Sequence, residues 1–425
     1  MNKILCGLLM AAAATTAFAQ GGTNSPYSQF GLGELSPQGV GFNKGMNGLG
    51  IALHRGNQTN PVNPASYASM DSLTFLFDMG MSGEVTNFKE GGKALNARTG
   101  NFDYAIAAFR VLKGLGMSFG IMPLTDVGYE YSSSAYLPEA KERSTVTYSG
   151  DGGFNKLFVG IGGRIAKPLS VGVNVSYLWG HYYRGVTSVM STNASLYKLY
   201  EAEAHNFAID FGLQYDQKLS KNDKLTLGLT YGFGHKLNAD AHCSVISSNS
   251  LTGKADSTKF TAANALAIPH TFGAGLAYTH GQSLTIGVDA EMQKWGSLEF
   301  PTFDSTTDKY VLQKGLLKDS YRFVAGLEWV PNPTSRRFFD RVRYRIGGGY
   351  RTPYYKINES DGPKEISASI GFGIPIFNNY NTRSLVNVSG QWVRRSAEGF
   401  VTENTFRINI GLTFNERWFA KWRVE

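Results

Sequence analysis

The chain has 425 residues, of which 42% are hydrophobic, 13% aromatic and only 17% charged, and its formal net charge is +8. This composition is too aromatic and too weakly charged for a disordered chain, and after the first twenty residues no stretch approaches the roughly 20 apolar residues of a membrane-spanning helix. The 50 glycines, 22 tyrosines and 27 phenylalanines favour a large all-β protein, of which a transmembrane barrel is one kind.

Residues 1–19 have the pattern of a Sec signal peptide. Lys3 supplies the positive start, residues 4–17 form a short apolar run, and Ala17-Phe18-Ala19 is a cleavage site. A lipoprotein anchor at Cys6 is disfavoured because a modified cysteine would stand at the end of the apolar run. Cleavage would leave Cys243 as the one cysteine, so we expect no intramolecular disulfide. An exported chain without a nucleic-acid motif has no expected nucleic-acid partner.

Residues 20–70 are dominated by Gly, Asn, Ser and Pro and lack sustained alternation, so we expect compact irregular structure or a plug. Within this segment, Asn63-Pro64-Ala65 follows a first Asn-Pro step. Two Asn-Pro steps make a rigid pair of turns, and Pro64 suits the first turn of a short helix. An ordinary turn is the alternative interpretation.

From Asp71 onward the hydrophobic pattern has period two, and apolar faces begin or end with aromatic residues, as the girdles of a barrel require. Alternation alone would also fit a soluble sandwich. The segments number fourteen, and they predict a transmembrane antiparallel β-barrel over residues 71–414, with a periplasmic tail at 415–425. They begin near Leu73, Arg98, Gly114, Gly153, Leu169, Tyr200, Asp223, Ala265, Gln282, Asp319, Arg341, Pro363, Thr382 and Thr402.

The connections between these segments alternate in length. Short ones lie at residues 112–114, 166–168, 220–223 and 279–282, and long ones at 127–152, 238–264 and 296–318. Short turns on one side and long loops on the other are typical of outer-membrane barrels, with both chain ends on the periplasmic side. We therefore expect the protein in the cell outer membrane.

Charged residues occupy the strand positions that alternate with the apolar ones, which predicts that they line the lumen. There they can pair with one another, whereas facing lipid each would cost roughly 2–4 kcal/mol near the midplane. They form either a polar pathway or a charge network that only fills and stiffens the lumen. The predicted lumen charges are Asp289, Glu291, Arg322, Glu328, Arg343, Arg345 and Arg407.

No residue set in the sequence predicts catalysis, a metal site or a cofactor. No known metal-ligand spacing matches His235, His242 and Cys243, and the simpler interpretation is that they lie in a loop. His205 lies on the apolar parity without an obvious serine beside it, so a hydrolase triad is not expected.

Three features together resemble the FadL-type family of outer-membrane transporters for hydrophobic compounds. A glycine-rich start leads into Asn63-Pro64-Ala65, which is similar to the NPA element of that family's N-terminal hatch. Residues 268–278, followed by 284–292 and Trp295, resemble the family's hairpin that a proline opens and a tryptophan closes. The number of predicted strands, fourteen, equals the number of strands in the family's barrel.

The resemblance implies passive uptake of long-chain fatty acids or other hydrophobic molecules, released sideways into the membrane through a kinked third strand. Here the third segment contains Gly116, Gly120 and Pro123, which favour a local opening because proline cannot donate to the ladder. Alternatively, Pro123 only ends the strand at the rim. The expected partners are a hydrophobic small molecule, outer-membrane lipid and the barrel-assembly machinery, and the expected oligomeric state is a monomer.

A second hypothesis is a FadL-like barrel that does not transport and acts as a surface or secretion-system adaptor, as PorV-like barrels do. A continuous apolar cavity would favour transport, and a filled lumen with an exposed apolar loop patch would favour the adaptor.

Overall fold

The computed structural model describes residues 22–72, 74–137, 142–190, 194–249, 251–304, 307–357, 360–376 and 384–417. The expected signal peptide, residues 1–19, lies outside this part of the chain. Among the described residues, no helix is both long and apolar enough to cross a membrane.

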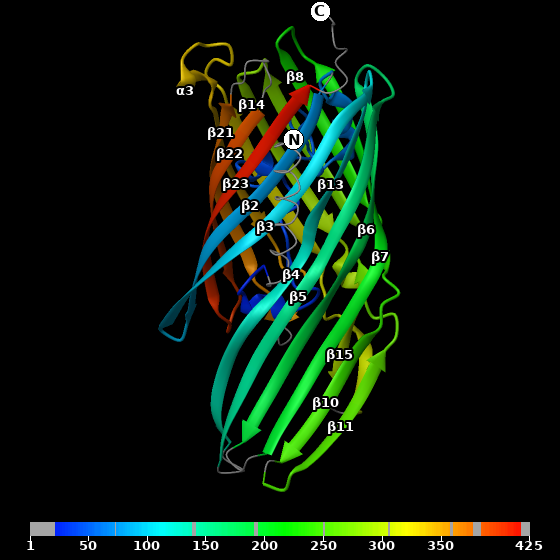
Figure 1. Cartoon of the computed structure of the whole chain (residues 1–425), viewed down its shortest axis with the longest axis vertical. Helices are drawn as coiled ribbons and strands as arrows, with labels where there is room; N and C mark the ends of the chain where they lie inside the picture. Colours follow the sequence, from blue (N-terminus) through cyan, green and yellow to red (C-terminus); the bar gives the residue numbers. More distant parts are fainter. Residues whose placement is uncertain are drawn as a thin grey trace, which may run out of the picture.

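Fourteen antiparallel strands form a closed barrel, as the period-two pattern predicts, and β23 pairs with β2 to complete the ring (Figure 1). The barrel strands are β2 (Thr74–Glu90), β3 (Lys93–Leu112), β4 (Leu115–Leu137), β5 (Glu142–Arg164), β6 (Leu169–Met190), β7 (Ala194–Lys218), β8 (Asp223–Gly232), β13 (Thr271–His280), β14 (Leu284–Gln293), β17 (Ser320–Trp329), β18 (Arg343–Arg351), β21 (Lys364–Ile376), β22 (Ser384–Ser396) and β23 (Thr402–Arg417). The last strand thus continues past the expected end at Phe414, and residues 418–425 of the expected tail lie outside the described ranges.

Alternate side chains of each strand point away from the lumen and form an apolar outer surface. On β23, for example, Phe406, Ile408 and Ile410 are more than half exposed, whereas Arg407 and Asn409 between them are buried. An apolar outer row with a polar inner row is the arrangement of a barrel whose outer surface faces lipid.

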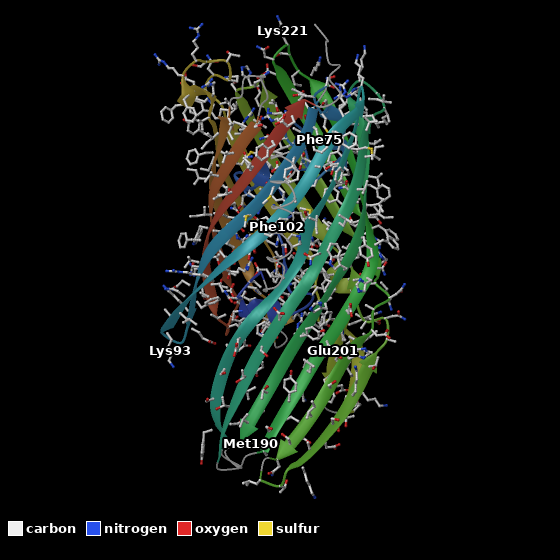
Figure 2. All side chains as sticks on the ribbon, in the orientation of Figure 1. Phe75, Lys93, Phe102, Met190, Glu201 and Lys221 are labelled. Carbon is white, nitrogen blue, oxygen red and sulfur yellow. The ribbon has the colours of Figure 1, made fainter. Side chains whose placement is uncertain are left out.

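Short turns gather at one end of the barrel, which we call the short-turn end. They connect β3 to β4, β5 to β6, β7 to β8 and β13 to β14, and Lys221 marks one of them in Figure 2. The connection from β17 to β18 also lies there and carries α3 (Phe338–Arg341).

The opposite, long-loop end differs from the expectation in one respect. Residues 127–152 do not form a loop, because β4 and β5 stay paired from Val127↔Gly152 to Leu137↔Glu142. These strand extensions carry Ser and Thr on alternate positions, as in the Ser132–Thr147 hydroxyl pair. They therefore lack the apolar alternation that identified the barrel strands, and the sequence pattern missed them.

The other long connections contain short strands that fold over the long-loop end (Figure 1). They are β9 (His235–Lys236), β10 (Ala241–Asn249), β11 (Lys254–Ala262), β12 (Ala267–Ile268), β15 (Glu299–Asp304), β16 (Lys309–Lys314), β19 (Lys356–Ile357) and β20 (Ser360–Asp361), with the 3-10 turn η3 (Trp295–Ser297). β10 pairs with β7 and β11, so the extended sheet continues beyond the barrel wall. Beneath them, Tyr182, Leu266, Trp295 and Tyr354 belong to one buried apolar cluster that fills this end.

Residues 22–72, which we call the hatch, lie inside the barrel. They contain η1 (Pro26–Gln29), β1 (Glu34–Leu35), α2 (Gly41–Lys44) and η2 (Pro64–Ser69). Phe42, Met46, Leu49 and Tyr67 of the hatch are almost fully buried against the wall. The hatch contacts the inner face through α2 on β21 to β23 and through η2 on β3 to β7.

A row of glycines on four adjacent strands lets η2 approach the wall. Gly116, Gly162, Gly172 and Gly212 pair directly across β4 to β7. A Cβ at any of them would lie 2.1–2.4 Å from an atom of the hatch. Because two of these contacts are with backbone oxygens of Pro64 and Tyr67, a side chain could not be accommodated without moving η2.

Candidate functional site

Asn63 fixes the start of η2 and joins it to the wall. Its side-chain oxygen accepts a hydrogen bond from Ala65 N at 3.1 Å, which caps the turn, and Pro64 occupies the first position as expected for a helix start. Its amide nitrogen donates to Ile51 O at 2.7 Å and to Leu213 O at 3.2 Å. Asn63-Pro64-Ala65 therefore starts η2, the last turn of the hatch, and anchors the hatch to β7.

Glu328 is the centre of an ion cluster that ties the hatch to the barrel. It is 2% exposed and accepts hydrogen bonds from Arg55 of the hatch at 2.7 Å and from Arg343 and Arg345 of β18 at 3.0 and 2.8 Å. Arg345 also donates to Asn387 Oδ1 at 2.6 Å. Three guanidinium groups on one buried carboxylate make a rigid cross-link between hatch and wall.

The remaining predicted lumen charges also lie on the inner face. Asp289 accepts hydrogen bonds from Gly50 N and Ile51 N of the hatch at 2.7 and 2.9 Å. Arg322 donates to Asn47 O at 3.1 Å and lies 3.9 Å from Glu291, and Arg407 pairs with Glu84 at 2.7 Å. Most of these charges thus hold the hatch or each other and do not line an open polar pathway.

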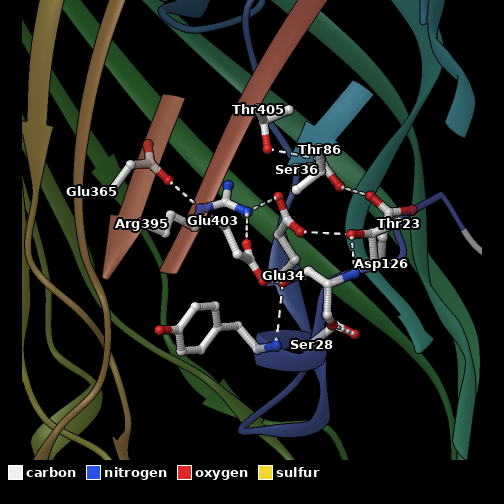
Figure 3. A network of polar contacts seen from close by, with 12 residues as sticks. Thr23, Ser28, Glu34, Ser36, Thr86, Asp126, Glu365, Arg395, Glu403 and Thr405 are labelled. Atoms are coloured by element: carbon white, nitrogen blue, oxygen red, sulfur yellow. Dashed lines mark hydrogen bonds and ion pairs between the residues drawn. The ribbon is translucent and has the colours of Figure 1, made fainter. Parts of the chain in front are cut away.

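A second network surrounds Arg395 (Figure 3). Its guanidinium lies 2.6 Å from Glu34 of β1, 2.9 Å from Glu365 and 3.9 Å from Glu403. Ser25 donates to Glu403 at 2.6 Å. One guanidinium thus joins β1 of the hatch to Glu365 of β21 and Glu403 of β23.

The wall is paired over only part of its height between β3 and β4. Their ladder runs from Leu112↔Leu115 to Ala105↔Ile121. Beyond it, β3 pairs with β2 alone, and β4 pairs with β5 and, at Thr125 and Asp126, with β1 of the hatch. Figures 1 and 2 show the β2–β3 hairpin, with Lys93 at its tip, diverging from β4. We call this opening, between residues 93–104 of β3 and 122–137 of β4, the seam.

The three residues proposed for a lateral exit lie at different heights along β4. Gly120 pairs with Ile106 at the last rungs of the β3–β4 ladder, and the register with β5 shifts between Pro123 and Thr125, at the start of the seam. Gly116 lies closer to the short-turn end and faces Tyr67 of the hatch. Pro123 does not end the strand, because β4 continues to Leu137.

The bend at Pro123 continues across the neighbouring strands through glycines that the sequence reading did not single out. Gly153 of β5 and Gly180 of β6 have φ of +142° and +154°, and a Cβ on either would lie 2.2–2.3 Å from a carbonyl oxygen of the adjacent strand. Adjacent glycines at 152 and 153, where the sequence pattern predicts that a strand begins, were the available signal for such a bend.

A cavity of about 530 Å³ lies at the seam, and its lining is rich in carboxylates. Glu34, Asp103, Asp126 and Asp151 line it, as does Arg407, whose charge is paired with Glu84. Asp103 pairs with Lys44 at 2.6 Å, and Asp126 accepts a hydrogen bond from Ser36 at 2.6 Å. Within the described ranges, neither Asp126 nor Asp151 forms an ion pair.

The histidines and the cysteine of the long-loop end have structural surroundings. His235 stacks on Phe207, and His242 lies 2.9 Å from the Thr261 hydroxyl. Cys243 is fully buried, and burial raises the pKa of its thiol to about 11. Among the described residues, no group of three or more His, Cys, Asp or Glu side chains is arranged to hold a metal ion.

The fold and the hatch together define the class of protein: a closed fourteen-stranded barrel of the FadL type with an N-terminal plug. Its fold matches the Pseudomonas aeruginosa FadL homologue with a TM-score of 0.63 at 12% identity, covering 90% of this chain and 99% of that one. It also matches the P. putida toluene transporter TodX with a TM-score of 0.62 at 13% identity, covering 91% and 100%, and the Ralstonia pickettii toluene transporter TbuX with 0.58 at 13%, covering 90% and 98%.

The family model described as BamG matches residues 1–425, the whole chain. The chain therefore belongs to the BamG family. A search of curated proteins finds no match.

Proposed function

We propose that the protein is an outer-membrane barrel that works as a closed, membrane-embedded platform and holds a partner protein at its long-loop end. The apolar outer surface supports the membrane location, since outward-facing apolar rows are what a barrel presents to lipid. The short-turn end would face the periplasm. Outer-membrane lipid and the barrel-assembly machinery that inserts such barrels are the further partners of this proposal.

One observation carries the platform function: packed chain occupies both halves of the lumen, and the cavity of about 530 Å³ lies at the seam. The hatch is fixed to the wall in the short-turn half by the Glu328 cluster and the glycine row, and it reaches the long-loop half, where Tyr27 and Leu32 join the buried apolar cluster. The buried apolar cluster around Tyr182 and Tyr354 occupies the long-loop half. A barrel built for passage would need both halves to rearrange, whereas a platform needs them rigid.

The strand extensions supply the surface for a partner. β4 to β7, continued by β10 and β11, extend as a sheet beyond the apolar outer surface at the long-loop end (Figure 1). On β11, the side chains of residues 254–259 are all exposed. Such a sheet adds nothing to a pore but offers a large area to another protein.

Two measurements on the same cells test the platform. Membranes solubilised in mild detergent and run on a native gel should show this chain in a species larger than the purified barrel. Uptake of radiolabelled oleate should be the same with and without the protein. Faster oleate uptake by cells in which the protein migrates alone would contradict the proposal.

Passive uptake of a hydrophobic molecule with lateral exit is the second candidate, and the seam is the observation that favours it. The cavity there lies beside the bend at Pro123, and two of the similar structures are named as toluene transporters. An apolar ligand would gain roughly 25 cal/mol per Å² on leaving water, but it would meet the carboxylates of Asp126 and Asp151 at the seam. A Pro123→Val variant that folds normally and takes up toluene more slowly would support this candidate.

A further inference from the structure

The seam leaves a strand edge of β4 without a partner strand over most of its length. Gly128 N–H donates to Ser28 Oγ at 3.1 Å, and Gly128 O accepts from the same hydroxyl, so the backbone groups of Gly128 point toward the seam. Backbone groups alternate in direction along a strand. Those of Glu130, Ser132 and Ser134 therefore point toward the seam as well, and no strand pairs with them there among the described residues.

The chain itself demonstrates that this edge accepts a strand. β1 of the hatch pairs antiparallel with β4 through Glu34↔Asp126 and Leu35↔Thr125, and Ser36 N donates to Leu124 O at 3.0 Å. The hatch occupies only the first positions of the edge. Ser28 of η1 already bonds the backbone of Gly128, so an added strand could line the edge from Glu130 toward Ser134.

The charges around the seam select the chemistry of such a strand. On the β4 side, Asp126 and Asp151 line the cavity and Glu130 is exposed on the free edge, and none of the three forms an ion pair within the described part of the chain. The exposed cations Lys93 and Arg98 lie on β3, across the seam. An acidic partner or an anionic headgroup would be repelled there. A polypeptide that carries Lys or Arg would be attracted.

We propose that the seam is a docking site for an extended, basic polypeptide segment of a partner protein, which pairs with the free edge of β4 beside Ser132. This mode of recognition takes its affinity from main-chain hydrogen bonds and its specificity from side-chain pockets and charges. The inference rests on the proposed platform function and names where the partner binds.

The test uses the purified full chain in detergent and a fluorescent peptide of alternating lysine and valine, with binding followed by anisotropy. The peptide should bind, and a peptide with glutamate in place of lysine should not. Ser132→Pro should weaken binding at least about tenfold, because it removes an edge N–H and blocks the approach of a strand. Ser132→Thr is the matched control and should bind as the wild type does.

Charge is tested separately with Asp151→Asn, which should weaken binding about threefold, as expected for an exposed ion pair. Asp151 is exposed, so its variant carries little risk of misfolding. Equal binding of the two peptides, or wild-type affinity of Ser132→Pro, would overturn the proposal.

Two other occupants would also overturn it. Light scattering that shows a dimer unable to bind the peptide would assign the seam to a second copy of the chain. Loss of peptide binding when the barrel is moved into lipid nanodiscs would assign it to lipid. Either result would leave the platform in place without this docking site, whereas oleate uptake tests the platform independently.

Discussion

Replacing Glu328 with alanine should loosen the hatch more than any other single change in the lumen. The carboxylate is 2% exposed and is the shared acceptor of Arg55, Arg343 and Arg345. Removing one partner of a buried ion pair costs roughly 3–5 kcal/mol, because the other charge stays buried without compensation. Arg55 and Arg343 are about one fifth exposed and can be hydrated after the change. We therefore expect a loss of about 3 kcal/mol in unfolding free energy, as for one broken ion pair and not for three.

Denaturant unfolding of the purified barrel, followed by tryptophan fluorescence, measures this loss. Glu398→Ala, at an exposed carboxylate in the β22–β23 connection, is the matched control and should change stability by less than about 0.5 kcal/mol. The double variant Arg55→Ala with Glu328→Ala should lose less unfolding free energy than the two single variants lose together, since it removes one uncompensated cation. A loss below about 1 kcal/mol for Glu328→Ala would refute the cross-link.

Three further predictions concern the hatch and the long-loop end. Gly172→Val should destabilise the barrel by about 1–3 kcal/mol in the same unfolding assay, because its Cβ would lie 2.4 Å from the carbonyl carbon of Pro64. Gly83→Val, where nothing lies within 4 Å, is its control, and equal effects would contradict the close approach. Asn63→Ala should cost at least the roughly 0.5–2 kcal/mol of a lost cap, and an unchanged unfolding midpoint would contradict the anchoring role. Cys243 should resist maleimide at pH 7 in the folded protein and react faster as the pH rises toward 11, since burial raises its pKa and only the thiolate reacts. Rapid labelling of folded protein at pH 7 would contradict its burial.

The sequence predicted the barrel because lipid imposes a strict pattern on each strand. Rows such as Phe406, Ile408 and Ile410 alternate with polar residues, and fourteen such segments could be counted without a structure. Beyond the membrane this constraint ends. The extensions of β4 and β5 carry polar residues on alternate positions, so their pairing follows from continuity with the barrel and not from a hydrophobic period.

The site was predictable to a smaller extent. Parity identified Glu328 and Arg345 as facing the lumen, but it could not indicate that Arg55 of the hatch would join them, because that contact spans 273 residues of sequence. The sequence also could not predict that four glycines align across adjacent strands, at Gly116, Gly162, Gly172 and Gly212. Each glycine has meaning only beside its neighbours across the sheet, and strand register is not visible in a single sequence.

Planar-bilayer conductance tests the central claim, that the hatch closes the lumen, most directly. The full-length barrel should show no steady conductance. A variant without the hatch, residues 22–72, checked for barrel formation by its heat-dependent migration on a gel, should conduct ions. Steady conductance through the full-length protein, or no change when the hatch is removed, would contradict the account.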